Sequence, residues 1–241
     1  MERVKQPFKI SNSEIRSGKL TRSYTIVQIS DLHNHLYGEK QSWLVSAVLA
    51  PKPDFVVCTG DLFNRHKATA HQNAFTLIDE LVPHVPVYVV EGNHEAALNE
   101  TGERYLKAIA DKGAILLRNA ETDVEDLHII GLKQRASREE LTSRIRPKRF
   151  NLVLCHRPEL FPDYAGSGAD LILCGHAHGG QIRIGNVALF APGQGIFPKY
   201  TSGLYKKQGT TMYVSRGLGD TELLLRIHNP HELCVFRLSP A

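Results

Sequence analysis

The chain has 241 residues, of which 42% are hydrophobic and 22% charged, a composition typical of a soluble globular protein and unlike that of a disordered one. Its formal net charge of +4 at pH 7 is too small to predict binding to nucleic acid or to a membrane surface from charge alone. There is no apolar stretch of the roughly 18 residues that a transmembrane helix needs and no signal-peptide pattern, so we expect a cytoplasmic protein whose residues 1–241 form one domain.

Six short apolar runs, rich in Val, Ile, Leu and Tyr, each stop at a glycine or a polar cluster. Runs of this length and β-branched content are typical of strands that are buried on both faces. The runs cover residues 24–30, 55–60, 85–92, 127–132, 151–156 and 171–176.

Helix-length segments alternate with the first strands, at residues 39–50, 68–82 and 99–113. In the second of them four apolar residues share one face at helical spacing: Ala74, Leu77, Ile78 and Leu81. Strands that alternate with helices indicate an α/β fold. Beyond residue 178 the chain breaks into short β-like pieces separated by Gly and Pro, which predict antiparallel strands and loops of a second sheet.

The four cysteines form no CxxC pair, and three of them end apolar runs. They are Cys58, Cys155, Cys174 and Cys234. We therefore expect buried free thiols rather than a disulfide framework or a zinc site built on cysteine.

Asp, Asn and His side chains follow five of the predicted strands. The motifs are "SDLHNH" from residue 30, "GDLFNR" from 60, "GNHEA" from 92, "CHRPE" from 155 and "CGHAHGG" from 174. Each polar residue alone has an ordinary structural explanation, such as a turn, a helix cap or a core histidine. Five such residues at five strand ends do not have an ordinary structural explanation together. Because the carboxyl ends of strands in an α/β sheet share one edge, we expect these residues to meet in one site.

The candidate ligands are oxygen and imidazole donors without any thiolate, a set that suits Mn, Fe, Zn or Co. They are Asp31, His33, Asp61, Asn93, His156, His176 and His178. This set is too large for one ion and sufficient for two if a carboxylate bridges them. Two metals about 3.5–4 Å apart are the arrangement that clamps the attacking and leaving oxygens of a phosphoryl transfer. His94 then remains beside a ligand without having to be one.

In this order, the motifs D-x-H, GD, GNH[ED], H and GHxH closely resemble the calcineurin-like metallophosphoesterase superfamily, over most of the chain from about residue 24 onward. The segments "APGQGIFPKYTSGLY" and "YVSRGLG" further resemble its bacterial YkuE/YaeI-like branch, which includes phosphodiesterases and enzymes acting on UDP-diacylglucosamine. The resemblance implies an α/β fold of four layers, an αββα sandwich of two mixed β-sheets flanked by helices.

The resemblance also implies how two divalent metal ions, with Mn favoured, would be held. One ion would be bound by Asp31, His33 and His178. The other would be bound by Asn93, His156 and His176. Asp61 would bridge the two ions, and His94 matches the family's general acid. The implied reaction is hydrolysis of a phosphodiester or pyrophosphate-type bond by direct attack of a metal-bridging hydroxide.

We therefore expect a hydrolase acting on phosphoric ester bonds, with a small-molecule substrate linked to a lipid or a nucleotide. The alternatives are a nuclease of the same fold and a non-catalytic scaffold. A nuclease calls for a basic track with aromatic residues, and the most basic stretch, residues 133–150, contains only Phe150. A scaffold would have lost ligands, and here every motif position is filled. Nucleic acid is not an expected partner, peripheral membrane contact stays open, and the sequence leaves the oligomeric state undetermined.

Two segments and two side chains keep open roles. Residues 133–150 carry seven Lys or Arg and residues 189–205 carry four aromatic residues, so either segment could set substrate specificity. The alternative for residues 189–205 is packing within the second sheet, and for residues 133–150 it is a solvated surface. Glu95 could fix His94 or pair elsewhere, and His35 could contact substrate or lie in an exposed loop.

Overall fold

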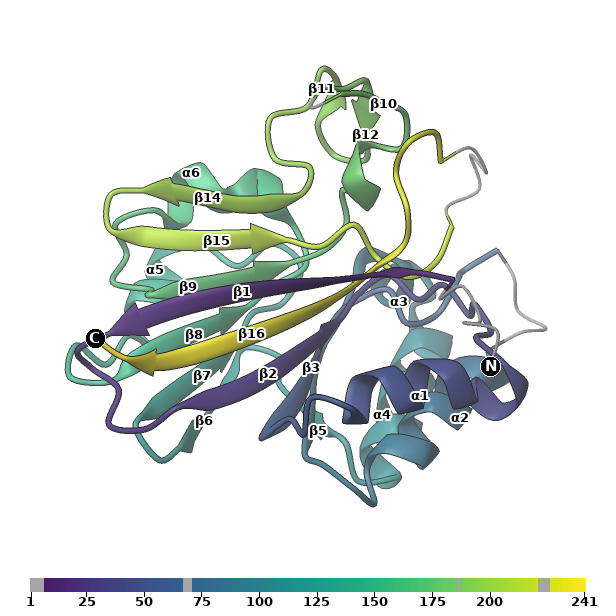
Figure 1. Cartoon of the computed structure of the whole chain (residues 1–241), viewed down its shortest axis with the longest axis horizontal. Coiled ribbons are helices and arrows are strands. Elements are labelled where there is room, and N and C mark those ends of the chain that lie inside the picture. The colour runs from purple at the N-terminus through teal and green to yellow at the C-terminus, as the bar shows by residue number, and fades with distance from the viewer. Residues whose placement is uncertain (1–6, 67–70, 186, 221–225) are drawn as a thin grey trace, which may run out of the picture.

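The structure, a computed structural model, describes residues 7–66, 71–185, 187–220 and 226–241. Two six-stranded sheets lie face to face, and helices cover the outer side of each (Figure 1). The αββα sandwich that the sequence motifs imply is therefore confirmed.

The first sheet has the strand order β1-β16-β2-β3-β4-β5. In that order the strands are Lys9–Ser17, Glu232–Pro240, Tyr24–Ile29, Phe55–Thr59, Val87–Val90 and Ile115–Leu116. β2, β3 and β4 run parallel, because helix-length segments connect them, whereas β16 runs antiparallel to β2 and parallel to β1.

The second sheet has the strand order β14-β15-β9-β8-β7-β6. In that order the strands are Gly203–Lys207, Thr210–Val214, Leu171–Cys174, Phe150–Leu154, Leu127–Gly131 and Ala120–Val124. The four inner strands are parallel, and a hairpin closes each edge with an antiparallel strand.

Three apolar clusters fill the spaces between the four layers. The first packs the first sheet on α1 (Ser42–Leu49), α2 (Gln72–Leu81) and α4 (Glu100–Asp111). The second lies between the sheets. The third packs the second sheet on α5 (Arg138–Thr142) and α6 (Phe161–Tyr164).

Neighbouring residues of one strand pack in different apolar clusters, because side chains alternate between the faces of a strand. Ile26 lies between the sheets, and Val27 packs on the helices of the first layer. Leu152 and Val153 divide in the same way between the second and third clusters. This double burial explains why these strands are continuous apolar runs in the sequence.

The prediction that the C-terminal strand belongs to the second sheet is wrong. β16 was expected in the second sheet, but it is an inner strand of the first, with Val235 facing the helices and Phe236 facing the other sheet. Apolar alternation identifies a strand but not its hydrogen-bonding neighbour, so the pattern could not have placed it. One of the β-like pieces expected after residue 178 covers residues 223–229, and its residues 223–225 lie outside the described residues, as does the start of the helix predicted at 68–82.

Of the β pieces after residue 178, β14 and β15 join the second sheet as expected, whereas the short pieces between residues 183 and 196 join neither large sheet. They form two small hairpins that project from the top of the molecule in Figure 1. One pairs β10 (Arg183–Ile184) with β11 (Val187–Ala188), and the other pairs β12 (Phe190–Ala191) with β13 (Gly195–Ile196). Glycines and prolines keep these strands too short to extend a sheet.

All four cysteines are free and buried, as the sequence predicts. Among the described residues, none of the helices combines the length and the apolar character needed to cross a membrane.

The packing between the sheets can be tested at Ile26, whose side chain has no exposed surface. Ile26→Ala should lower the free energy of unfolding by about 2–5 kcal/mol, because it removes contacts and leaves a cavity. Ile184→Ala is the control, since Ile184 is 69% exposed, and should change stability by less than about 0.5 kcal/mol. Urea denaturation measures both, and equal effects would contradict the described core.

Candidate metal centre

Five strand ends bring the candidate ligands together, although the strands belong to two sheets. In the first sheet Asp31 follows β2, Asp61 follows β3, and α3 (Asn93–Ala97) follows β4. In the second sheet His156 follows β8 and His176 follows β9. The expectation of a single shared sheet edge was therefore wrong. The edges of two sheets meet because the sheets pack face to face.

One group of donor atoms is formed by Asp31, His33 and His178, which are all buried. The Nε2 atoms of His33 and His178 lie 3.1 Å apart, and His178 Nε2 lies 3.4 Å from Asp31 Oδ1. One donor atom from each residue lies within 4.8 Å of the others.

A second group is formed by Asp61, His156 and His176. His156 Nε2 lies 3.2 Å from Asp61 Oδ2 and 3.1 Å from Asn93 Oδ1. Asp61 also lies within reach of the first group, because its Oδ2 is 3.8 Å from His33 Nε2. Asp61 is thus positioned between the two groups.

The acceptor atoms of the second group need a proton or a metal ion among them. His156 Nδ1 donates a hydrogen bond to the Thr59 carbonyl oxygen at 2.8 Å, which directs the Nε2 lone pair at the oxygens of Asp61 and Asn93. Three acceptors that face one another require a proton or a metal ion among them. A backbone carbonyl that fixes the far nitrogen is also the usual support of a metal-binding histidine, so these residues fit a divalent ion.

The buried charges of the site affect one another strongly. Burial raises the pKa of Asp31 to about 6. Burial also disfavours the Asp61 carboxylate, but the charge of His156 and its hydrogen bond to Asp61 outweigh burial and hold the pKa of Asp61 well below its usual range. Burial would lower the pKa of His156, and the Asp61 carboxylate instead raises it to about 10. Burial lowers the pKa of His33 to about 3 and keeps this imidazole neutral, the form that binds metals.

Backbone strain is concentrated at the candidate ligands. Five of them have positive φ angles between 47° and 66°: Asp31, His33, Asp61, His176 and His178. For residues with a side chain such angles cost on the order of 1 kcal/mol or more each, and they persist where the surrounding structure enforces them. The strained turns after β2, β3 and β9 therefore lower the stability of the fold and position these side chains in the site.

Two glycines allow the backbone to approach the carboxylates. A Cβ added at Gly92 would lie 2.0 Å from Asp61 Oδ1, and one at Gly175 would lie 2.3 Å from Asp31 Oδ2. No other residue fits at either position. The glycines of the "GNH" and "GHAH" motifs are therefore required by the site, in addition to the ligands.

Glu95 fixes the turn that carries Asp61, a role that the sequence left open. Its Oε2 accepts hydrogen bonds from the backbone N–H groups of Asp61 at 2.9 Å and Gly92 at 2.7 Å, and its Oε1 accepts one from Phe63 at 2.9 Å. Burial raises the pKa of Glu95 to about 7, and the charge of Asp61 acts in the same direction. Glu95 thus ties the turns after β3 and β4 together.

His94 is half-buried beside the two groups. Its Nδ1 accepts a hydrogen bond from the Arg65 backbone N–H at 3.2 Å, so a neutral His94 carries its proton on Nε2. Its backbone N–H donates to Asp61 Oδ1 at 2.8 Å, and its ring centroid lies 4.5 Å from that of His33. The side chain is therefore oriented by contacts that leave Nε2 as a donor.

Two arginines beside the ligands were missed by the sequence analysis. Arg157 Nη1 lies 3.2 Å from His176 Nε2, and Arg226 Nη2 lies 3.0 Å from His178 Nδ1. Arg157 directly follows His156 in the "CHRPE" motif, a signal that could have identified it. Arg226 has no motif, and only the folded chain brings it to His178.

The structure bears on three expectations about neighbouring residues. In the basic stretch 133–150 some cations form ion pairs, such as Arg146 with Asp123 at 2.5 Å, whereas Arg135 is exposed and lines a cavity with Arg157, so a role of this stretch in specificity stays a prediction. Tyr200 does not wall a substrate pocket, because it is buried and packs on Phe161 and Tyr205. His35 is half-buried and its ring packs on Tyr37 and His231.

Comparisons with known proteins agree with this site. A family model described as calcineurin-like phosphoesterase matches residues 24–180. The uncharacterized metallophosphoesterase YkuE of Bacillus subtilis is 29% identical, over 98% of this chain and 88% of YkuE. The phosphodiesterase YaeI of Escherichia coli is 26% identical, over 81% of this chain and 75% of YaeI.

Solved structures support the fold. The protein TT1561 of Thermus thermophilus aligns with a TM-score of 0.53 at 11% identity, over 81% of this chain and 90% of TT1561. The NAD nucleotidase NadN of Haemophilus influenzae also aligns with a TM-score of 0.53, at 13% identity, over 81% of this chain and 45% of NadN.

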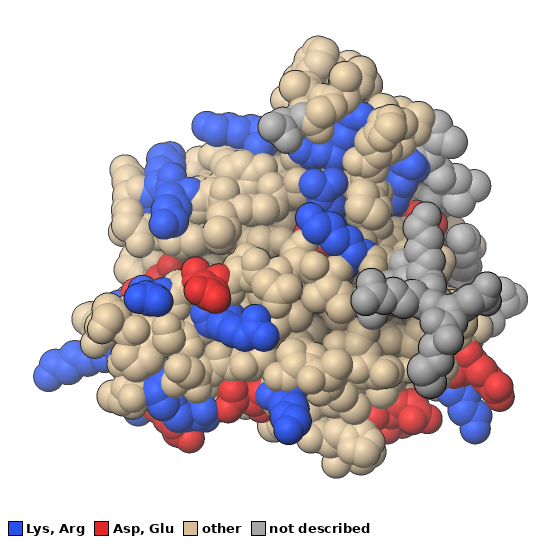
Figure 2. Space-filling model, in the orientation of Figure 1, with Lys and Arg blue, Asp and Glu red and all other residues tan. Residues whose placement is uncertain are grey.

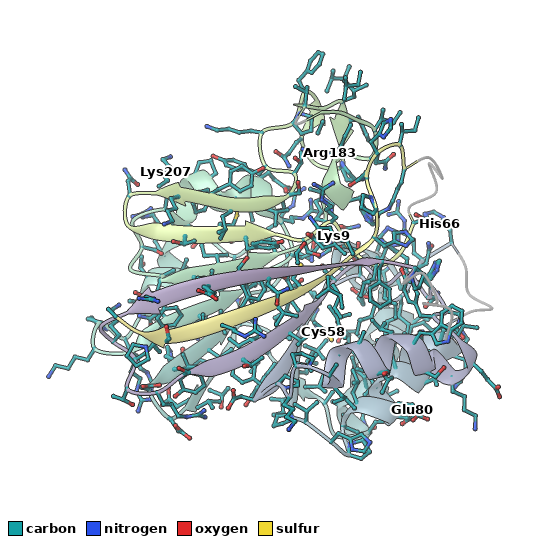
Figure 3. The ribbon with its side chains drawn as sticks, viewed as in Figure 1. Lys9, Cys58, His66, Glu80, Arg183 and Lys207 are labelled. Atoms are coloured by element: carbon teal, nitrogen blue, oxygen red, sulfur yellow. The ribbon has the colours of Figure 1, made fainter. Side chains whose placement is uncertain are left out.

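Glu95→Gln tests the support of the Asp61 turn. The amide would turn a donor toward backbone N–H groups that already donate, so we expect a loss of about 1–3 kcal/mol in the free energy of unfolding. Metal affinity should fall by roughly 10–100-fold, the usual effect of losing a residue that orients a ligand. Glu80→Gln removes an exposed carboxylate (Figure 3) and should change neither quantity. Calorimetry of unfolding and of metal binding measures both, and a neutral Glu95→Gln would refute the assigned role.

Proposed function

The chain belongs to the calcineurin-like phosphoesterase family, and on that premise we propose that it is a binuclear metal-dependent phosphodiesterase. It is a hydrolase acting on phosphoric ester bonds. The observation that supports two metals is the position of Asp61, whose Oδ2 faces His33 of one donor group and His156 of the other.

When bound, two divalent metals, with Mn favoured, would activate water and offset the charge on the phosphoryl oxygens. Asp31, His33 and His178 would hold one of them. Asn93, His156 and His176 would hold the other, with Asp61 shared. The buried ligands exclude bulk water from one side of the substrate, and the half-buried Asn93 and His94 lie where substrate would enter.

His94 is proposed to donate a proton from Nε2 to the leaving oxygen. The hydrogen bond from Arg65 to Nδ1 orients the ring for this step. Arg157, beside His176, is proposed to bind a phosphoryl oxygen through its guanidinium group, which suits oxyanions.

The proposed substrate is a small-molecule or lipid-linked phosphodiester. The name of the relative YaeI, a phosphodiesterase, supports this class of bond. A nuclease is less well supported, because four of the seven cations of residues 133–150 are engaged in ion pairs: Lys133, Arg144, Arg146 and Arg149.

Metal stoichiometry tests the binuclear centre. Protein saturated with Mn should bind two equivalents, and Asp61→Asn should weaken both sites because it removes the shared carboxylate. Asp163→Asn, which changes an exposed carboxylate, should retain both. Elemental analysis after dialysis measures this, and saturation at one equivalent in the unmodified protein would overturn the proposal.

The role of His94 is tested with two diesters that differ in leaving group. His94→Ala should keep both metals and lose roughly 10²–10⁴-fold in kcat on an alkyl diester, because an alkoxide needs a proton. The loss on bis-p-nitrophenyl phosphate should be smaller, since nitrophenolate leaves without one. His84→Ala, an exposed histidine, is the control. Equal losses on both substrates would reassign His94 to binding or structure.

A further inference from the structure

A cavity of about 730 Å³ is lined by residues of β1, β14 and the β10–β11 hairpin. Its volume lies within the range of small-molecule sites. The described residues that line it include none of the eight candidate residues of the metal centre. It is therefore separate from the site described above.

The walls of this cavity are strongly basic. Among the described residues that line it, Glu232 is the one carboxylate and four side chains are cationic: Lys9, Arg183, Lys199 and Arg216. Figure 2 shows a band of basic side chains beneath the projecting hairpins, and in Figure 3 Lys9 lies on β1 below Arg183. Such an excess of positive charge favours an anionic ligand.

Glu232 does not neutralise these cations through side-chain ion pairs. Its carboxylate accepts hydrogen bonds from the hydroxyls of Ser11 at 2.5 Å and Tyr213 at 3.2 Å, and from the backbone N–H of Arg216 at 3.0 Å. The Arg216 guanidinium donates to the Asn229 amide oxygen at 3.1 Å, and it forms no ion pair with any carboxylate in the part of the chain that the structure describes.

Arg183 is buried and held in place at the cavity wall. Its Nη1 donates to the Gly179 carbonyl oxygen at 2.7 Å and to Thr201 Oγ1 at 3.1 Å. Burial lowers the pKa of Arg183, and the charge of Arg216 acts in the same direction.

Apolar side chains line the same cavity beside the cations. Val187, Phe197 and Leu204 line it and are 53%, 70% and 47% exposed. Phe197 has a φ angle of 53°, a strained conformation for a residue with a side chain. A ligand with both an anionic and an apolar part would cover this surface.

We propose that the cavity binds a phosphorylated ligand, with the phosphoryl group held by Lys9, Arg183, Lys199 and Arg216 and an apolar part against Phe197. Guanidinium forks and ammonium groups match the oxygens of a phosphoryl group in charge and geometry. The proposal does not depend on the chemistry at the metal centre.

Phenylphosphonate is a suitable probe, because it carries a dianionic head and an aromatic ring and has no ester bond to hydrolyse. Titration calorimetry on the full chain with its metals should show binding that weakens at least tenfold in Lys9→Gln/Lys199→Gln, which loses two charged contacts. Lys148→Gln/Lys207→Gln changes the net charge equally at exposed positions outside the cavity and should bind as the unmodified protein does.

Two further measurements separate this cavity from the metal centre. The constant for inhibition of bis-p-nitrophenyl phosphate hydrolysis by phenylphosphonate should be the same in Lys9→Gln/Lys199→Gln and in the unmodified protein. Phe197→Ala should weaken the binding of phenylphosphonate and not that of inorganic phosphate. The proposal is overturned by equal losses in both double variants, by absent binding, or by an inhibition constant that rises in step with the dissociation constant. A chain without phosphodiesterase activity would leave the calorimetric test intact.

The phosphoryl group could belong to a free metabolite or to a lipid headgroup. Sedimentation with phosphatidylglycerol vesicles distinguishes the two sources. Binding to vesicles that is lost in Lys9→Gln/Lys199→Gln and displaced by phenylphosphonate assigns a lipid. Phenylphosphonate binding without sedimentation assigns a free ligand.

Discussion

The buried carboxylate of Asp61 is the constraint on which the site depends. It lies at the contact of two sheets, and its oxygens face imidazoles from both, with His33 at 3.8 Å and His156 at 3.2 Å. A buried carboxylate is costly unless cations and hydrogen bonds surround it. Gly92 leaves room for it, and Glu95 fixes its backbone from the other side. The turns after β3 and β4 are thus shaped around one side chain.

That constraint also explains why protons alone satisfy the site poorly. Burial favours neutral Asp31 and neutral His33, whereas Asp61 favours a charged His156. A single proton on His156 balances one carboxylate, and the Nε2 atoms of His33 and His178, which lie 3.1 Å apart, need a further proton between them. Divalent cations would satisfy the lone pairs of both groups at once, because carboxylate oxygens and imidazole nitrogens are their usual ligands.

The six apolar runs correspond to inner strands of the two sheets, and the ordered motifs implied the four layers through the family resemblance. The sequence did not predict the edge strands β1 and β6, because their partly exposed residues form no apolar run. It could not predict features that depend on long-range pairing. The place of β16 required knowledge of its neighbours, and the role of Glu95 required the turn after β3 to meet the turn after β4. Tyr200 lies in a segment rich in Gly and Pro, a composition typical of a loop, but its side chain packs in the third core cluster. Its burial depends on the path of the chain after the small hairpins and not on the local sequence.

The segment 189–205 lies next to both the candidate metal centre and the basic cavity. At Gly193 an added Cβ would lie 3.0 Å from His176 Nε2, whereas Phe197 and Lys199 line the basic cavity. Tyr200, which follows Lys199, is anchored in the third core cluster. The interpretation as packing therefore holds for Tyr200. Contact of this segment with a substrate stays a prediction, which the backbone at Gly193 supports by its approach to His176.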